Sequence, residues 1–320
     1  MHWQPSASLE TLHHRAQCLQ KIRQFFIERH VLEVETPLLS HATVTAPHLS
    51  SIPAYFQPIG SDNQQKVFLQ TSPEYAMKRL LAAGSGPIFQ LTKAFRQGEI
   101  GKRHNPEFTM LEWYRPGWDH HQLMDEMDEF LQTVLTCLPA KRLSYSQAFQ
   151  QFLNLDPHTI SLEELISYIN THAIKAEWVN DRDTLLDILF THCIEPHFSQ
   201  NRPCFLYDFP ISQAALAKIC YEQQPPTASR FEVYFKGIEL ANGFHELQDS
   251  QEQRRRFEND LAYRKQHQLE LLPIDERLLA ALAHGLPDCA GVALGIDRLI
   301  MLALDCQTIS HVLSFPFEDA

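Results

Sequence analysis

The stretch IFQLTKAFRQGEIGKRHNPEFTMLEWY, residues 88–114, carries the pattern that decides the fold. Apolar residues alternate with polar ones before a charged loop, and the polar face of this first strand ends at Arg96. After the loop, Met110, Glu112 and Tyr114 share one face of a second strand. The stretch predicts a hairpin that presents an arginine and carboxylates to an anionic ligand carrying an amine. An ordinary solvated hairpin has the same spacing.

Length, charge and cysteine spacing limit the class of protein. The chain has 320 residues and a formal net charge of −12, and 44% of its residues are hydrophobic. This length allows a large core, and the acidic total counts against tRNA as the main partner because a nucleic-acid backbone needs a basic face. The seven cysteines contain no C-x-x-C pair, which favours reduced thiols in the cytoplasm. No signal peptide or apolar run of about 18 residues is present, so we expect no membrane span.

Three segments resemble the signature motifs of class II aminoacyl-tRNA synthetases. RQGEIGKRHNPEFTMLEWY is similar to motif 2 in its lysyl-tRNA synthetase form, and GVALGIDRLIMLAL, residues 291–304, to motif 3. FFIERHVLEVETPLL, residues 25–39, resembles motif 1, which implies a homodimer interface. This segment predicts a helix over residues 8–29 and a strand from Val31 to Glu35, although His30 stands where the family usually has a small residue. The predicted apolar face of the helix comprises Leu9, Leu12, Ala16, Leu19, Ile22 and Phe26.

The resemblance implies an α+β fold, a class II synthetase catalytic domain with an antiparallel sheet flanked by helices. We expect a single domain over residues 1–320, with a helical insertion at about 118–203 between motifs 2 and 3. Helical patterns fall at 118–137, 144–153, 161–171, 181–195, 252–268 and 276–284, and a buried strand at 204–210. Motif 1 begins near residue 25, so no OB-fold anticodon-binding domain, and no anticodon recognition, is expected.

KVFLQTSPEYAMKRLLAAG, residues 66–84, predicts a strand followed by a helix. Thr71 and Ser72 suit the cap of this helix and Pro73 its first turn. The resemblance places Ser72, Pro73 and Glu74 at the amino-acid pocket, with Glu74 facing the substrate amine. A glutamate that only complements the helix dipole is the alternative.

RFEVYFKGIELANGFHEL, residues 230–247, predicts a second carboxylate site. Glu232 and Glu239 have opposite parity in a plain strand, and we expect a bulge at Gly237 to bring them to one face. Two carboxylates on one face beside phosphates suit Mg²⁺. A solvated acidic strand with an Asn-Gly turn is the alternative.

The resemblance implies ATP-dependent adenylate formation, with roles for individual residues. Arg96 would clamp the α-phosphate, Phe108 and Arg298 would sandwich the adenine, and Arg96 and Arg298 would be catalytic. The implied ATP-binding residues are Arg96, Gly98, Glu99, His104, Asn105, Phe108, Glu239, Leu240, Gly295 and Arg298. The family reads Arg-x-Glu where this chain reads Arg96-Gln97-Gly98-Glu99, so either Glu99 reaches the adenine edge by a loop shift or that contact is lost.

The negative charge expected in the pocket indicates which amino acid the protein binds. Glu74, Glu112 and Glu246 are expected to line one pocket with Tyr114 and Asn242, left unneutralised by the protein. Carboxylates in one dry site need cations, and lysine supplies two amines. HNPEFTMLEWYRP and GVALGIDRL, with Ala293 where lysyl-tRNA synthetases have glycine, resemble the elongation factor P–lysine ligase family.

That family activates lysine, preferentially (R)-β-lysine, and joins it to the ε-amine of a lysine on elongation factor P. The cofactors implied are ATP and Mg²⁺. Two alternatives stay open, a truncated synthetase that charges tRNA or another carrier, and a non-catalytic regulatory paralogue. The regulator predicts loss of Arg96, Glu239 and Arg298, and all three are present.

Overall fold

The computed structural model describes residues 3–172, 174, 179–198 and 200–320. The chain divides into two compact units, each described by itself below. Unit 1 consists of Met1–Gly117 and Gln248–Ala320, and unit 2 of Trp118–Leu247. The predicted insertion therefore begins where unit 2 begins, but unit 2 continues beyond residue 203. That the whole chain acts as one catalytic domain stays a prediction.

The predicted hairpin is the centre of unit 1. β5 (Ile88–Phe95) and β6 (Glu107–Pro116) pair antiparallel over the whole length of β5, from Ile88 opposite Tyr114 to Phe95 opposite Glu107. β12 (Cys289–Gly295) pairs antiparallel with the other edge of β6, and β1 (Leu32–Glu33) lies parallel to β5. The predicted antiparallel pairing is confirmed for β5, β6 and β12, and the parallel β1–β5 pair makes the sheet mixed.

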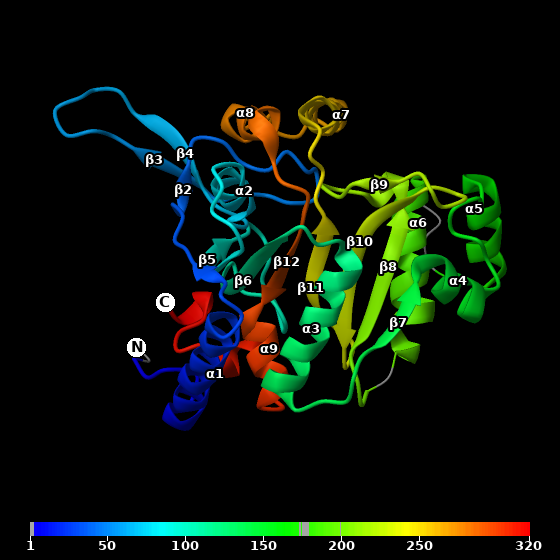
Figure 1. Cartoon of the computed structure of the whole chain (residues 1–320), viewed down its shortest axis with the longest axis horizontal. Coiled ribbons are helices and arrows are strands. Elements are labelled where there is room, and N and C mark those ends of the chain that lie inside the picture. The colour runs from blue at the N-terminus through cyan, green and yellow to red at the C-terminus, as the bar shows by residue number, and fades with distance from the viewer. Residues whose placement is uncertain (1–2, 173, 175–178, 199) are drawn as a thin grey trace. The chain divides into compact units, whose positions relative to one another are not determined.

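The remaining elements of unit 1 surround these strands (Figure 1). A second sheet holds β2 (Leu39–Ser40), β4 (Gln65–Leu69) and β3 (Pro53–Phe56), in that order. The helices are α1 (Leu9–Ile27), α2 (Glu74–Ala82), α7 (Ser250–Gln266), α8 (Glu276–Gly285), α9 (Ile296–Ala303), and the short 3-10 turns η4 (Ile309–Val312) and η5 (Phe317–Asp319). The chain ends lie side by side, since the Ser6 amide donates to the Ser314 carbonyl at 2.9 Å.

The core of unit 1 forms where α1 meets the apolar face of the hairpin. Phe26 stacks on Phe89 at 4.6 Å between ring centroids and meets Trp113 edge-on at 5.2 Å. All three side chains are fully buried, and each contributes about 1.5–3 kcal/mol by leaving water. The predicted apolar face of α1 is correct only in part, because the buried residues are Ile22, Phe25 and Phe26, whereas Leu9 is 71% exposed.

The turn after α1 explains the departure at His30. This residue has φ +54°, a left-handed conformation that glycine adopts without strain. The strand that follows is shorter than predicted, since β1 holds only Leu32 and Glu33. The sequence pattern could not show this, because its apolar residues continue past the two that pair with β5.

Unit 2 also consists of strands and helices. Its strands run in the order β11 (Ile238–His245), β10 (Thr227–Phe235), β8 (Cys204–Pro210) and β7 (Lys141–Ser144), with β9 (Ile219–Cys220) also on β10. β7 and β8 are parallel and the other pairs antiparallel. The helices are α3 (His120–Leu135), α4 (Tyr145–Leu153), α5 (Leu162–Thr171), α6 (Arg182–Leu189), and the short turns η1 (Phe190–Ile194), η2 (Glu195–His197) and η3 (Ile211–Gln213).

The helices predicted for this part of the chain are confirmed. The apolar stripe of α3, from Leu123 to Val134, is buried, and α3 packs against β10 and β11. α4, α5 and α6 form one hydrophobic cluster with β8 and β10, which includes Phe149, Leu186 and Leu206. Among the described residues, no helix combines the length and the apolar character that crossing a membrane requires.

Candidate active site

One face of the unit 1 sheet gathers residues that are far apart in the sequence. Glu112 on β6 lies opposite Gln90 on β5 and opposite Ala293 on β12. Cross-strand partners project their side chains to the same face, and the period of two along β5 brings Arg96 to this face as well. The polar face predicted from residues 88–114 is therefore confirmed, and motif 3 supplies Ala293 to it.

The centre of this face is buried. Glu112 and Tyr114 are each 2% exposed, and the Tyr114 hydroxyl donates to Glu112 Oε1 at 2.5 Å. Gln90 is equally buried, and its Oε1 accepts a hydrogen bond from the Thr36 hydroxyl. The hydrogen bonds fix the side chains, so the carboxylate has a defined position on the sheet face.

Arg96 lies directly after β5, and the loop curls back over it. Its Nη1 is 3.5 Å from Glu99 Oε1, and its guanidinium carbon is 5.1 Å from the centroid of the Phe108 ring. Gly98, the extra residue between Gln97 and Glu99, has φ +82°. This left-handed conformation turns the chain so that Glu99 faces Arg96. Glu99 therefore faces Arg96, and its contact with an adenine edge stays a prediction.

Motif 3 and the motif 2 loop meet at Arg298. Its Nη2 donates to His104 Nε2 at 2.6 Å, and its Nε donates to the Arg103 carbonyl at 3.3 Å. Partial burial lowers the pKa of His104, and the Arg298 charge lowers it further. The imidazole is therefore neutral near pH 7 and accepts from the guanidinium. These bonds hold Arg298 at the first turn of α9, where Gly295 is the N-cap.

Asn105 has a structural task in this loop. Its Nδ2 donates to the Glu107 carbonyl at 2.6 Å, and its Oδ1 accepts from the Phe317 amide at 2.9 Å. The side chain is buried. These two bonds occupy both ends of the amide, so Asn105 shapes the loop beside His104, and its predicted contact with ATP stays untested.

The region around Glu74 requires two corrections. Thr71 and Ser72 do not cap α2, because Pro73 is the N-cap and no side chain bonds there. Glu74 is not left unneutralised, because Lys78 Nζ lies 2.7 Å from its Oε1. Lys78 is one turn further along the same helix, a spacing that favours such pairs and that is visible in the sequence.

Ser72 and Pro73 border a small cavity of about 120 Å³ within unit 1. Its lining also includes residues of the segment 37–44 and, further along the chain, Arg79, Asp275 and Arg277. Two of the residues predicted to bind the amino acid therefore face an accessible space.

The predicted site residues of unit 2 lie on and near the β10–β11 hairpin. The prediction of a bulge at Gly237 is wrong. Lys236 and Gly237 form the two-residue turn, with φ +51° and +68°. The register shifts further along, where Tyr234 pairs with Glu239 and Val233 with Ala241, so Leu240 is the extra residue.

The bulge at Leu240 brings Glu232 and Glu239 to one face of the hairpin, as predicted for a bulge at Gly237. Glu232 lies opposite Asn242, and Tyr234, two residues on, lies opposite Glu239. Glu232, Glu239 and Asn242 therefore share one face, with Glu239 exposed and Leu240 buried. Glu246 follows β11 and is 1% exposed.

Arg230 is a residue that the sequence analysis missed. It forms an ion pair with Glu232, its Nε donates to Asn242 Oδ1 at 3.1 Å, and its Nη1 donates to the Gln213 carbonyl. Tyr234 donates a hydrogen bond to the other oxygen of Glu232. The period of two along β10 would have placed Arg230 and Tyr234 beside Glu232.

Asp297 was likewise missed, although it belongs to motif 3. It is 1% exposed, its Oδ1 lies 2.6 Å from Arg15 Nη2, and its Oδ2 accepts from the Thr109 amide at 2.7 Å. It therefore ties the start of α9 to α1 and β6, next to Arg298.

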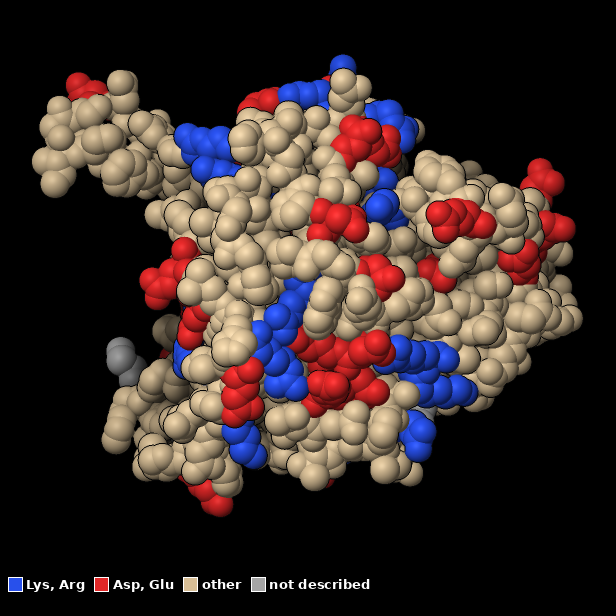
Figure 2. All heavy atoms as spheres, viewed as in Figure 1, with Lys and Arg blue, Asp and Glu red and all other residues tan. Residues whose placement is uncertain are grey.

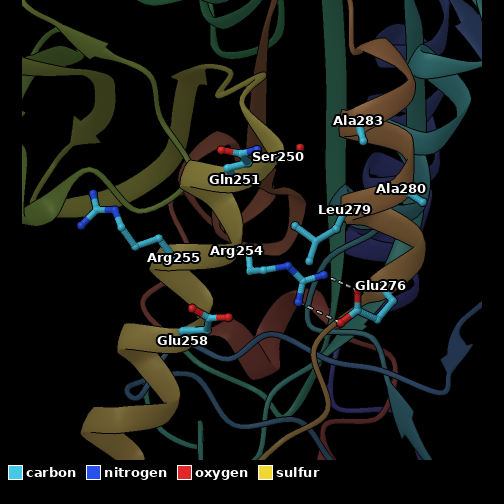
Figure 3. A pocket seen from close by; sticks show the side chains of 9 residues that line it. All are labelled: Ser250, Gln251, Arg254, Arg255, Glu258, Glu276, Leu279, Ala280 and Ala283. Carbon is cyan, nitrogen blue, oxygen red and sulfur yellow. Dashed lines mark hydrogen bonds and ion pairs between the residues drawn. The ribbon is translucent and has the colours of Figure 1, made fainter.

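A separate pocket lies between α7 and α8, and it contains none of the predicted site residues (Figure 3). Arg254 spans it and holds both carboxylate oxygens of Glu276, at 3.1 and 2.5 Å. On the face shown in Figure 2, groups of basic side chains lie next to groups of acidic ones.

The fold and the three motifs define a class II synthetase catalytic domain. The family model of class II tRNA synthetases (D, K and N) matches residues 1–319, so the chain belongs to this family.

Among its relatives the similarity is more particular. Elongation factor P–(R)-β-lysine ligase of Haemophilus influenzae strain PittGG is 54% identical over 319 residues, covering 100% of this chain and 98% of that protein. The ligase of the same name from Vibrio parahaemolyticus serotype O3:K6 is 57% identical over 320 residues, with 99% of both chains covered. That from Salmonella paratyphi B strain ATCC BAA-1250 / SPB7 is 53% identical over 321 residues, with 99% and 98% covered.

Proposed function

We propose that this protein is an ATP-dependent ligase that activates lysine or (R)-β-lysine and transfers it to a lysine ε-amine of elongation factor P. The observation that carries the proposal is the shared sheet face of unit 1, on which Arg96, Glu112 and Ala293 lie together. An anion-binding arginine beside a buried carboxylate suits a ligand pair of ATP and an amine-bearing amino acid. The full-length relatives support the choice of acceptor.

The first step joins the amino acid to AMP. A carboxylate oxygen of the lysine attacks the α-phosphorus of ATP, the bond to the bridging oxygen breaks, and pyrophosphate leaves. Arg96 stabilises the charge that develops on the α-phosphate, and Arg298 packs on the adenine opposite Phe108. Because neutral His104 accepts from Arg298, the guanidinium is already oriented before ATP binds.

The second step transfers the acyl group. The ε-amine of the acceptor lysine attacks the acyl carbon, the C–O bond to AMP breaks, and the amine loses a proton. Glu74 and Glu112, both in unit 1, bind the amines of the substrate, and a role for Glu246 stays a prediction. The Glu74–Lys78 ion pair implies that the substrate amine shares or displaces Lys78 as the partner of Glu74.

Glu232 and Glu239 fit a Mg²⁺ site because their carboxylates share one face of the hairpin. Mg²⁺ supplies charge neutralisation for the departing pyrophosphate when bound. Arg230 and Tyr234 orient Glu232 toward one geometry.

The methyl group of Ala293 sets the choice of lysine isomer. It lies directly opposite Glu112, about 5 Å away between Cβ atoms, so it narrows the space beside the carboxylate. The Ala293→Gly variant is expected to lose part of its preference for (R)-β-lysine over lysine in ATP–pyrophosphate exchange. An unchanged preference would count against this role.

We also propose a cytoplasmic homodimer. All seven cysteines are free thiols, as expected in a reducing compartment. On α1 and the edge strand β1, Leu9, Ile27 and Leu32 are 71%, 57% and 55% exposed. Exposed apolar side chains of this kind on a helix and an edge strand favour self-association.

The decisive experiment is intact-mass analysis of elongation factor P after incubation with the protein, ATP, Mg²⁺ and each lysine isomer. We expect a mass increase of one lysyl residue, larger in yield with (R)-β-lysine. A parallel reaction with tRNA and radiolabelled lysine tests the truncated-synthetase alternative. An unmodified factor under every condition would refute the proposal, and the absence of pyrophosphate exchange would favour the regulatory paralogue.

A further inference from the structure

The first turn of α3 and the end of β8, both in unit 2, hold a cluster that the proposed reaction does not use. His120 and Asp208 are each 6% exposed, whereas His121 is exposed. One potential ligand atom from each of the three residues lies within 4.8 Å of the other two. Within the described part of the chain, this is the one His/Cys/Asp/Glu group that meets this condition.

The backbone is shaped to bring these side chains together. Tyr207 and Asp208 are adjacent on β8, and neighbours in a plain strand point to opposite faces. Here Asp208 lies at an irregularity of the β8–β10 register and has φ +58°. Its carboxylate contacts His120 at 3.2 Å while the Tyr207 ring meets His121 edge-on at 5.3 Å, so both residues face the start of α3.

Asp208 has a supporting contact of the kind that orients metal ligands. The second oxygen of Asp208 accepts a hydrogen bond from Gln223 Nε2 at 3.0 Å, which fixes the carboxylate. Outer partners of this kind orient metal ligands and strengthen binding. The rings of His120 and His121 lie 4.1 Å apart between centroids, so both imidazoles reach the same space.

His120 provides an independent observation. Its Nδ1 is buried and has no hydrogen-bond partner among the described residues. A buried polar atom without a partner is unfavourable, and the contact of His120 Nε2 with Asp208 leaves Nδ1 unsatisfied. His120 therefore has a buried nitrogen that the described residues leave without a partner.

We propose that His120, His121 and Asp208 bind a divalent transition metal of the Zn²⁺ type. Two imidazoles and one carboxylate form a ligand set that Zn²⁺ favours over Mg²⁺, with water at the fourth position. The partial positive charge at the N-terminus of α3 disfavours a bound cation, but the negative charges of Asp208 and the N-cap Asp119 offset this effect. The ion would clamp the start of α3 to β8, independently of the ligase reaction.

The test is titration of the metal-free full-length protein with Co²⁺, which reports tetrahedral nitrogen and oxygen ligation by its visible absorption. His121→Asn is the main variant because His121 is exposed and its loss leaves the core intact, and Asp208→Asn is the second. His13 and His14 are an adjacent exposed pair on α1, so the His13→Asn/His14→Asn double variant is the matched control.

We expect stoichiometric Co²⁺ binding, displaced by Zn²⁺, in the wild type and the control, and binding about 10- to 100-fold weaker in His121→Asn and Asp208→Asn. Thiolate charge-transfer absorption would instead assign the metal to cysteines. That absorption, undetectable binding, or equal affinity in His121→Asn would overturn the proposal. Circular dichroism verifies that each variant is folded.

Discussion

Single residues determine the chemistry around Arg298. His104 is its hydrogen-bond acceptor only while the imidazole is neutral. Burial, and then Arg298 itself, lowers the pKa of His104 below the usual value of about 6.5. Because the pKa is depressed in the folded protein, His104 binds its proton at a higher pH in the unfolded chain than in the folded one. The contribution of His104 to stability is therefore fully present above pH about 6.5, and it is lost as the pH falls below that value.

The variant His104→Gln tests this dependence. Glutamine accepts from Arg298 at every pH, so we expect the wild type to lose unfolding free energy relative to the variant as the pH falls from about 7 to about 5. The KM for ATP of the wild type should rise several-fold over the same interval, and that of the variant should stay flat. His172→Gln, at an exposed histidine of unit 2, is the control and should follow the wild type. Parallel profiles for wild type and His104→Gln would contradict the assignment.

Asp297 is predicted to matter for stability because its partner is buried with it. The side chains of Arg15 and Asp297 are 14% and 2% exposed, and removal of one charge leaves the other uncompensated. We expect Asp297→Asn to lower the free energy of unfolding by about 3 kcal/mol in urea titration. Arg23 and Glu33 form the matched surface pair, at 45% and 39% exposure, and Glu33→Gln should cost less than about 1 kcal/mol. Equal losses in the two variants would contradict the argument.

At the scale of elements, the patterns that predicted well were those with one period and one buried face. The alternation along residues 88–95 and 108–114 indicated which side chains share a face, and the register of β5 and β6 confirms it. The strand at 204–210 coincides with β8. These elements are correct because burial of one face leaves few alternatives of register.

The patterns that failed depended on tertiary contacts. The sequence showed that Glu232 and Glu239 needed an irregularity to share a face, but Gly237 suited both a bulge and a turn. The structure makes it a turn, and the bulge falls at Leu240. The ion pair of Asp297 with Arg15 could not be predicted from the sequence either, because no local pattern links residues at opposite ends of the chain.

The β10–β11 turn gives a test at this scale. Gly237 has φ +68°, which costs a residue with a side chain about 1–2 kcal/mol. We expect Gly237→Ala to lower the free energy of unfolding by about 1 kcal/mol and to raise the Mg²⁺ concentration needed for half-maximal pyrophosphate exchange, since the turn sets the register of Glu239. Lys236→Asn, which creates the Asn-Gly pair favoured in such turns, should be neutral or stabilising. A neutral Gly237→Ala would show that another feature fixes the hairpin.

At the scale of the whole molecule, we expect the exposed apolar residues on α1 and β1 to form the interface of the proposed homodimer. β1 has a strand partner on one side only, β5. Leu32 on β1 and Ile27 at the end of α1 are more than half exposed. A two-fold axis through such a surface would bring each residue against its own copy or a neighbour and remove both from water. We therefore expect sedimentation velocity to give twice the chain mass of 37.0 kDa for the wild type.

The Ile27→Asp/Leu32→Asp variant should sediment as a monomer, because a carboxylate in an apolar interface stays unpaired. Ile59 is fully exposed in the loop between β3 and β4, so Ile59→Asp adds a similar charge away from this surface and should stay dimeric. A monomeric wild type, or a dimer that survives both aspartates, would show that the exposed apolar residues of α1 and β1 serve another contact.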